Sequence, residues 1–121
     1  MATTLTVCET CRGPGWAEGE PRQGEALALL VEAAATGSGV VVRRTQCLMG
    51  CDWGCNVAVQ APGKLAYALG RFAPTAEAAE GLVAWAALHA GSATGQVPYR
   101  QWPPAVKGHF TARLPPLPEE P

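Results

Sequence analysis

The sequence has no excess of charge of either sign, because its 9 Lys and Arg residues nearly balance its 10 Asp and Glu residues, which gives a net charge of −1. A basic surface of the kind that attracts nucleic acid or an acidic membrane is therefore not expected. No apolar run approaches the roughly 20 residues of a transmembrane helix, so no membrane association is predicted. The first residues, "MATTLTVCETC", lack the basic start and the apolar segment of a signal peptide, and we expect a cytoplasmic protein.

The usual signatures of catalysis are also missing from the 121 residues. We find no pair of catalytic carboxylates, no serine triad and no phosphate-binding loop, so the sequence does not indicate an enzyme. Charged residues make up only 16% of the chain and hydrophobic residues 48%, a balance typical of a globular protein. With no internal repeat, this length predicts one domain.

Cysteine, in contrast, is present in a distinctive arrangement. The five cysteines form two groups, "VCETCRG" with Cys8 and Cys11, and "CLMGCDWGC" with Cys47, Cys51 and Cys55. Because thiols stay reduced in the cytoplasm, two such groups indicate metal ligands or redox groups rather than a disulfide framework. The odd number leaves one cysteine over from any site with four thiolate ligands.

The second cysteine group has a spacing of four, which would align its three thiols on one face of a helix. Gly50 and Gly54 lie within this stretch, however, and each glycine costs a helix about 1 kcal/mol relative to alanine. We therefore predict a loop, in which glycine lets the backbone approach a bulky inorganic group closely.

The hydrophobic periodicity predicts an α/β fold. A parallel pair of strands with a crossover helix, followed by an antiparallel hairpin and a closing helix, is the βαββα core of the thioredoxin-like fold, a mixed sheet flanked by helices. We place this domain at residues 1–91 and predict that residues 92–121, with seven of the eleven prolines, form a tail packed on the same domain. The expected strand, helix, strand, hairpin and helix span residues 3–6, 24–36, 39–46, 56–69 and 74–91.

Both cysteine groups are expected at the ends of the first two strands. In a parallel β-α-β unit these ends are neighbours, so the groups can converge on one site although 35 residues separate Cys11 from Cys47. Thiolates select zinc, copper(I) or iron–sulfur clusters. Zinc sites commonly combine two C-x2-C pairs across a short loop, whereas the second group here has C-x3-C spacing and a whole helix separates the groups. This arrangement favours a site built on a folded scaffold over a small domain that folds around its metal.

The first pair, Cys8 and Cys11, also has the C-x-x-C spacing of thiol-disulfide oxidoreductases. In thioredoxins this motif opens a helix, whereas Gly13 and Pro14 follow it here. Dithiol chemistry is therefore the weaker alternative.

Resemblances to two groups of known proteins make the prediction of a metal or cluster site more specific. The segment "CLMGCDWGCNVAVQ" is similar to the second cluster loop of thioredoxin-like 2Fe–2S ferredoxins and of the related small subunit of respiratory complex I. Nearly the whole chain resembles the bacterial predicted metal-binding family known as domain of unknown function 1636, in the segments "TLTVCETCR", "CLMGCDWGCNVAV", "PGKLAYALGRFAP" and "ARLPP". The resemblance implies a thioredoxin-like fold and a thiolate-ligated 2Fe–2S cluster. Members are often associated with cobalamin biosynthesis or cobalt handling.

The resemblance also implies a set of ligands. By motif position, Cys8 matches the first ligand of the ferredoxins, and Cys47 and Cys51 match their second pair. The ferredoxins usually have a longer gap within the first pair, so the fourth position stays open between Cys11, which we expect, and Cys55, its competitor.

These observations predict an electron carrier that exchanges electrons with a redox partner protein and is not itself an enzyme. The alternative is a zinc- or cobalt-binding protein that stores, senses or delivers metal. The weaker alternative is a thiol-disulfide oxidoreductase. The sequence leaves the oligomeric state open, with a homodimer as one option.

Overall fold

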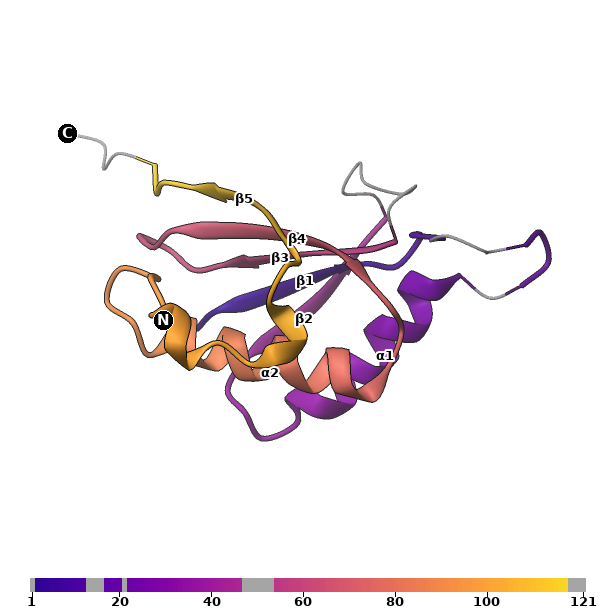
Figure 1. Cartoon of the computed structure of the whole chain (residues 1–121), viewed down its shortest axis with the longest axis horizontal. Coiled ribbons are helices and arrows are strands. Elements are labelled where there is room, and N and C mark those ends of the chain that lie inside the picture. Colours follow the sequence, from indigo (N-terminus) through magenta and orange to yellow (C-terminus); the bar gives the residue numbers. More distant parts are fainter. Residues whose placement is uncertain (1, 13–16, 21, 47–53, 118–121) are drawn as a thin grey trace.

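The computed structural model describes residues 2–12, 17–20, 22–46 and 54–117. In this part of the chain, five strands form one sheet on which two α-helices pack (Figure 1). The elements in chain order are β1 (Thr4–Cys8), α1 (Gln23–Ala35), β2 (Val41–Thr45), β3 (Cys55–Gln60), β4 (Ala66–Phe72), α2 (Ala76–Ala90), the short 3-10 helices η2 (Tyr99–Gln101) and η3 (Pro104–Val106), and β5 (Phe110–Leu114).

The sheet is mixed, with the strand order β2-β1-β3-β4-β5. β1 and β2 are parallel, with Cys8 beside Thr45, and α1 forms the crossover that a parallel pair requires. β3 runs antiparallel to β1, and β3 and β4 form the antiparallel hairpin, in which Val57 lies opposite Leu69. The α/β class, the parallel first pair and the hairpin that the sequence predicted are therefore confirmed.

Both helices cover the same face of the sheet (Figure 1). α1 buries Leu27 and Val31 and α2 buries Leu82, as the helical spacing of apolar residues predicted. α2 begins after Thr75, whose Oγ1 caps the helix by accepting a hydrogen bond from Ala78 N at 3.1 Å. None of the helices in the described ranges has the length and hydrophobicity that crossing a membrane would demand.

The C-terminal segment contains a strand that the sequence analysis did not predict. β5 pairs antiparallel with β4, with Arg113 opposite Tyr67. Its first residue, Phe110, packs against Trp102 with ring centroids 4.3 Å apart. The prolines of this segment lie before and after β5, not within it, and their density is typical of a loop, which is why no strand was predicted here.

A buried polar network connects the last turn of α2 to the start of β1. His89 Nε2 donates a hydrogen bond to Leu65 O at 2.7 Å, because a carbonyl oxygen can only accept. His89 Nδ1 therefore accepts from the hydroxyl of Thr3, at 2.9 Å. Burial lowers the pKa of His89, the hydrogen bond to Leu65 opposes this effect, and the nearby charge of Lys64 adds to it. The imidazole is neutral at pH 7.

We expect acid to destabilise the protein through His89. Above pH 6.5, the ordinary pKa of histidine, the side chain is neutral in the folded and the unfolded chain. Below it, the unfolded chain takes up a proton that the folded protein binds only at lower pH. The free energy of unfolding should therefore fall with decreasing pH, by up to about 1.4 kcal/mol per pH unit for this one group.

Chemical denaturation at a series of pH values between about 5 and 7 measures this slope. His89→Gln should flatten it, because glutamine takes up no proton in this range. A His89→Gln protein with the wild-type slope would show that another group takes up the proton.

Candidate metal centre

The N-terminal cysteine pair lies where β1 ends and the chain turns toward α1. Cys8 is the last residue of β1, and the next residue extends the pairing with β2, since Glu9 N donates to Thr45 O at 2.8 Å. Cys11 O accepts a hydrogen bond from Gly24 N, in the first turn of α1, at 2.9 Å. The backbone of the pair is thus attached to both β2 and α1.

The contact with α1 requires a glycine at position 24. A Cβ atom there would lie 2.1 Å from Cys8 O and 2.9 Å from Cys11 N, which are backbone atoms and cannot rotate away. The close approach places the positive end of the α1 dipole beside the pair, where it favours negative charge on sulfur. The sequence analysis placed Gly24 at the helix start and gave it no role at the cysteines, since no local pattern reports such a contact.

The thiols of Cys8 and Cys11 are fully buried and hydrogen-bonded to each other. Cys8 Sγ also lies 3.7 Å from Gln46 O, at the end of β2. From β3, Asn56 Nδ2 donates to Cys11 Sγ at 3.2 Å and to Gly54 O at 2.9 Å. The sequence analysis gave Asn56 no part in the site, and its position directly after Cys55 was the one available signal of this role.

Cys55 is the third described cysteine and the first residue of β3. It is as fully buried as Cys8 and Cys11, and it packs within the contiguous cluster of hydrophobic core side chains. Burial raises the pKa of Cys55 to about 12, and smaller contributions come from Cys11 and Cys8. β1 and β3 pair so that Val7 lies opposite Val57, which places Cys8 at the end of β1 and Cys55 at the start of β3 at the same end of the sheet.

Burial at this end of the sheet raises the pKa of the thiols and so disfavours free thiolates. Burial raises the pKa of Cys11 to about 11, the hydrogen bond with Cys8 adds to the increase, and the bonds with Asn56 reduce it. At neutral pH the thiols of Cys11 and Cys55 are therefore protonated. A cation that replaced the protons would stabilise the thiolate form, which is the form that ligates metals.

Cys47 and Cys51, two of the predicted ligands, lie outside the described residues. The residues on either side of this stretch, Gln46 and Gly54, are described, and both lie near the first cysteine pair. Gln46 O lies 3.7 Å from Cys8 Sγ. Gly54 O accepts a hydrogen bond from the Asn56 amide, which also donates to Cys11 Sγ. Within the part of the chain that the structure covers, no group of three or more His, Cys, Asp or Glu side chains is arranged to hold a metal ion. The ligand set therefore stays a prediction.

Comparison with known proteins gives one family. Its model, described as protein of unknown function (DUF1636), matches residues 5–116. The matched range includes all five cysteines and both α-helices. No curated protein and no solved structure matches the chain.

Proposed function

The chain belongs to the family of proteins of unknown function DUF1636, and we propose that it is an electron carrier holding a 2Fe–2S cluster on cysteine thiolates. The observation that carries this proposal is the buried pair of thiols of Cys8 and Cys11, which contact each other and receive a hydrogen bond to Cys11 Sγ from Asn56 of the distant strand β3. Gln46 and Gly54, the described residues on either side of the stretch that contains Cys47 and Cys51, both lie near this pair, which would allow that stretch to complete the site.

The proposal includes a thioredoxin-like fold. In support, a parallel β1–β2 pair with a crossover helix is followed by the antiparallel β3–β4 hairpin and α2. β5 is then an addition at the edge of that core. In such a scaffold the strand ends that carry the cysteines are neighbours before any metal binds, so the site would not have to nucleate the fold.

The surroundings of the cysteine pair suit an inorganic cluster with thiolate ligands. Hydrogen bonds to the sulfur atoms of such clusters stabilise their charge and adjust their reduction potential. Asn56 supplies one N–H donor to Cys11 Sγ, and the N-terminal end of α1 faces the pair through Gly24. A bound cluster would supply one-electron chemistry, and the buried thiols of this chain would hold it away from water.

We propose Cys8, Cys11, Cys47 and Cys51 as the four ligands. Cys11 is preferred to Cys55 because its thiol contacts that of Cys8 and is oriented by the Asn56 amide. Cys55 packs among apolar side chains of the core, where a buried cysteine ordinarily acts as a small hydrophobic residue. A redox partner protein would donate or accept the electrons.

The alternatives use the same thiols. A zinc or cobalt ion on them would make the protein a metal-delivery or metal-sensing module. A thiol-disulfide oxidoreductase is disfavoured, since attack on a disulfide needs an accessible thiolate, whereas Cys11 is fully buried and has a raised pKa. Roles in cobalamin biosynthesis or cobalt handling, and a cytoplasmic location, stay predictions.

Metal analysis of the anaerobically purified full chain tests the proposal. We expect a reddish-brown protein with iron and acid-labile sulfide in equal amounts, about two of each per chain. A Cys8→Ala/Cys11→Ala variant prepared in parallel should be colourless and should contain neither. A colourless wild-type protein with a stoichiometric amount of zinc would reject the electron carrier in favour of the metal-delivery or sensor alternative.

A further inference from the structure

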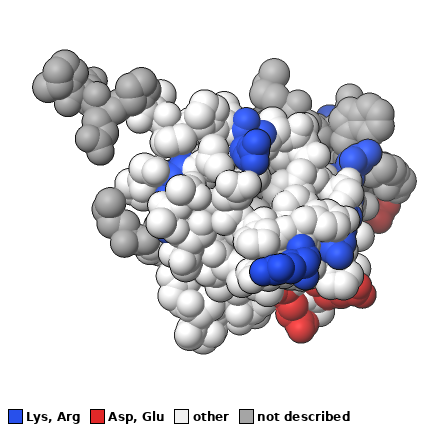
Figure 2. Space-filling view, turned by 60° about the vertical axis from the view of Figure 1, so that its left-hand side comes forward, with Lys and Arg blue, Asp and Glu red and all other residues white. Residues whose placement is uncertain are grey.

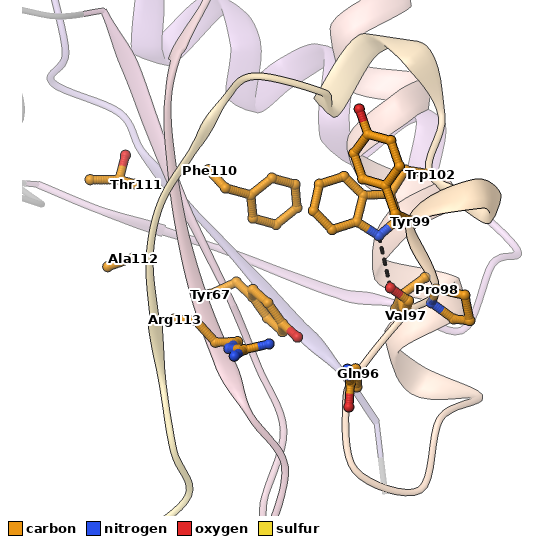
Figure 3. A pocket seen from close by; sticks show the side chains of 10 residues that line it. All are labelled: Tyr67, Gln96, Val97, Pro98, Tyr99, Trp102, Phe110, Thr111, Ala112 and Arg113. Carbon is orange, nitrogen blue, oxygen red and sulfur yellow. Dashed lines mark hydrogen bonds between the residues drawn. The ribbon is translucent and has the colours of Figure 1, made fainter.

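A cavity of about 440 Å³ lies between β4, β5 and residues 96–102, and no cysteine contributes to its described lining. Tyr67 of β4 forms its base, Phe110 and Arg113 come from β5, and Trp102 follows η2 (Figure 3). Its volume lies within the range of small-molecule sites. The described thiols lie elsewhere, since Cys8 ends β1, Cys11 follows it and Cys55 begins β3, and none of the three lines this cavity.

One end of the cavity is aromatic and rigid. The rings of Phe110 and Trp102 lie 4.3 Å apart between centroids, and that of Tyr99 lies 4.9 Å from Trp102. The indole is held in place, since Trp102 Nε1 donates to Val97 O at 2.9 Å (Figure 3). Aromatic side chains that are already held in place suit a ligand with a planar ring, because the ligand can stack on them or contact their edges without rearranging them.

The other end of the cavity is polar. Tyr67 and Arg113 lie opposite each other on β4 and β5, and in Figure 3 their polar ends and the side chain of Gln96 all lie below the Phe110 and Trp102 rings. Within the described part of the chain, no hydrogen bond or ion pair engages the Arg113 side chain. A guanidinium in this position presents parallel N–H donors that match the two oxygens of a carboxylate.

The charge around the cavity favours an anion. From Gly81 to Leu117 the chain contains Arg100, Lys107 and Arg113 but no Asp or Glu. Lys107 Nζ lies over the Tyr99 ring, 4.7 Å from its centroid. Figure 2 shows Lys and Arg side chains spread over the face turned toward the viewer, with Asp and Glu near its lower right border. A cationic ligand would be repelled here, although aromatic side chains line the cavity.

We propose that this cavity binds a small planar aromatic carboxylate. The ring of the ligand contacts Trp102 and Phe110, and its carboxylate pairs with the guanidinium of Arg113. Tyr67 and Gln96 are the neutral hydrogen-bonding groups beside that carboxylate. This inference is independent of the proposed cluster, because it uses none of the cysteines.

Titration of the full chain with 2-naphthoate, followed by amide and indole NMR shifts, tests the proposal. We expect saturable shifts at Trp102 Nε1–H and at the amides of β5. Arg113→Met should weaken binding about tenfold or more, because a charge-assisted pair is lost. Arg100→Met removes the same charge at a residue that does not line the cavity and should change the affinity by less than about twofold.

The neutral isostere 2-naphthamide separates charge recognition from stacking. We expect it to bind more weakly than 2-naphthoate and to be nearly insensitive to Arg113→Met. The proposal is overturned if 2-naphthoate causes no saturable shifts at millimolar concentration, if the shifts map away from Trp102 and β5, or if Arg113→Met and Arg100→Met weaken binding equally.

Discussion

Replacing Cys11 by serine should remove most of the bound iron, whereas replacing Cys55 should not. The Cys11 thiol contacts that of Cys8 and accepts a hydrogen bond from Asn56, so its loss deprives the site of an oriented ligand. We expect at least about a tenfold decrease in iron per folded chain. Iron and sulfide assays on the folded fraction, together with visible absorption, measure the effect.

The control for this experiment is the cysteine that packs in the core. Cys55→Ser places a hydroxyl among apolar side chains and should cost about 1–3 kcal/mol of stability. Cys55→Ala adds no polar group and separates the cost of polarity from any loss of a ligand. Both variants should retain iron. If they lose it while Cys11→Ser keeps it, Cys55 is the fourth ligand and the present assignment is wrong.

Gly24→Ala should damage the same site without touching a cysteine. The new Cβ atom would lie 2.1 Å from Cys8 O and 2.9 Å from Cys11 N, so α1 and the cysteine pair must move apart. Overpacking of this kind costs about 1–3 kcal/mol. Because the displaced atoms belong to the backbone of the pair, we also expect a clear loss of iron from the protein that remains folded. Thermal denaturation and iron analysis of the same samples report the two effects.

A second buried glycine provides the matched control. A Cβ atom at Gly81, in α2, would lie 2.7 Å from Ala105 Cβ of η3, and its three nearest atoms belong to Ala105 and Val106 rather than to the cysteine pair. Gly81→Ala should therefore lower the stability by a similar amount and leave the iron content of the folded protein unchanged. If Gly24→Ala binds iron as fully as Gly81→Ala does, the close contact of α1 with the cysteines has no part in holding the cluster.

The strands and helices were predictable because each depends on a pattern that repeats within a few residues. Leu27 and Val31 recur at helical spacing, and Val57 and Val59 alternate as one arm of a hairpin. β5 escaped prediction because its short segment lies between prolines and its burial is low except at Phe110. The conformation of β5 is decided by its pairing with β4 and by the contact of Phe110 with Trp102. Both contacts involve residues outside the strand, and those of β4 are distant along the chain.

The approach of the two cysteine groups could be predicted only in outline. The rule that parallel strands end at the same edge brings the end of β2 to Cys8, and the contact with Gln46 O agrees with it. The same rule says nothing about β3, which runs antiparallel and brings Cys55 and Asn56 to that edge from the other direction. The positions of Cys47 and Cys51 lie outside the described residues, so their part in the site stays a prediction.

The sequence by itself determined the α/β class, the order of the main elements, the two cysteine groups and the family to which the chain belongs. Only the tertiary structure decided that α1 meets the cysteine pair at Gly24, that Asn56 bonds Cys11, that Cys55 lies in the core, and that aromatic residues enclose a cavity with Arg113. The reason is physical. Periodicity and capping act between residues close along the chain, whereas these contacts depend on how separate elements pack, and packing sets distances that no local pattern records.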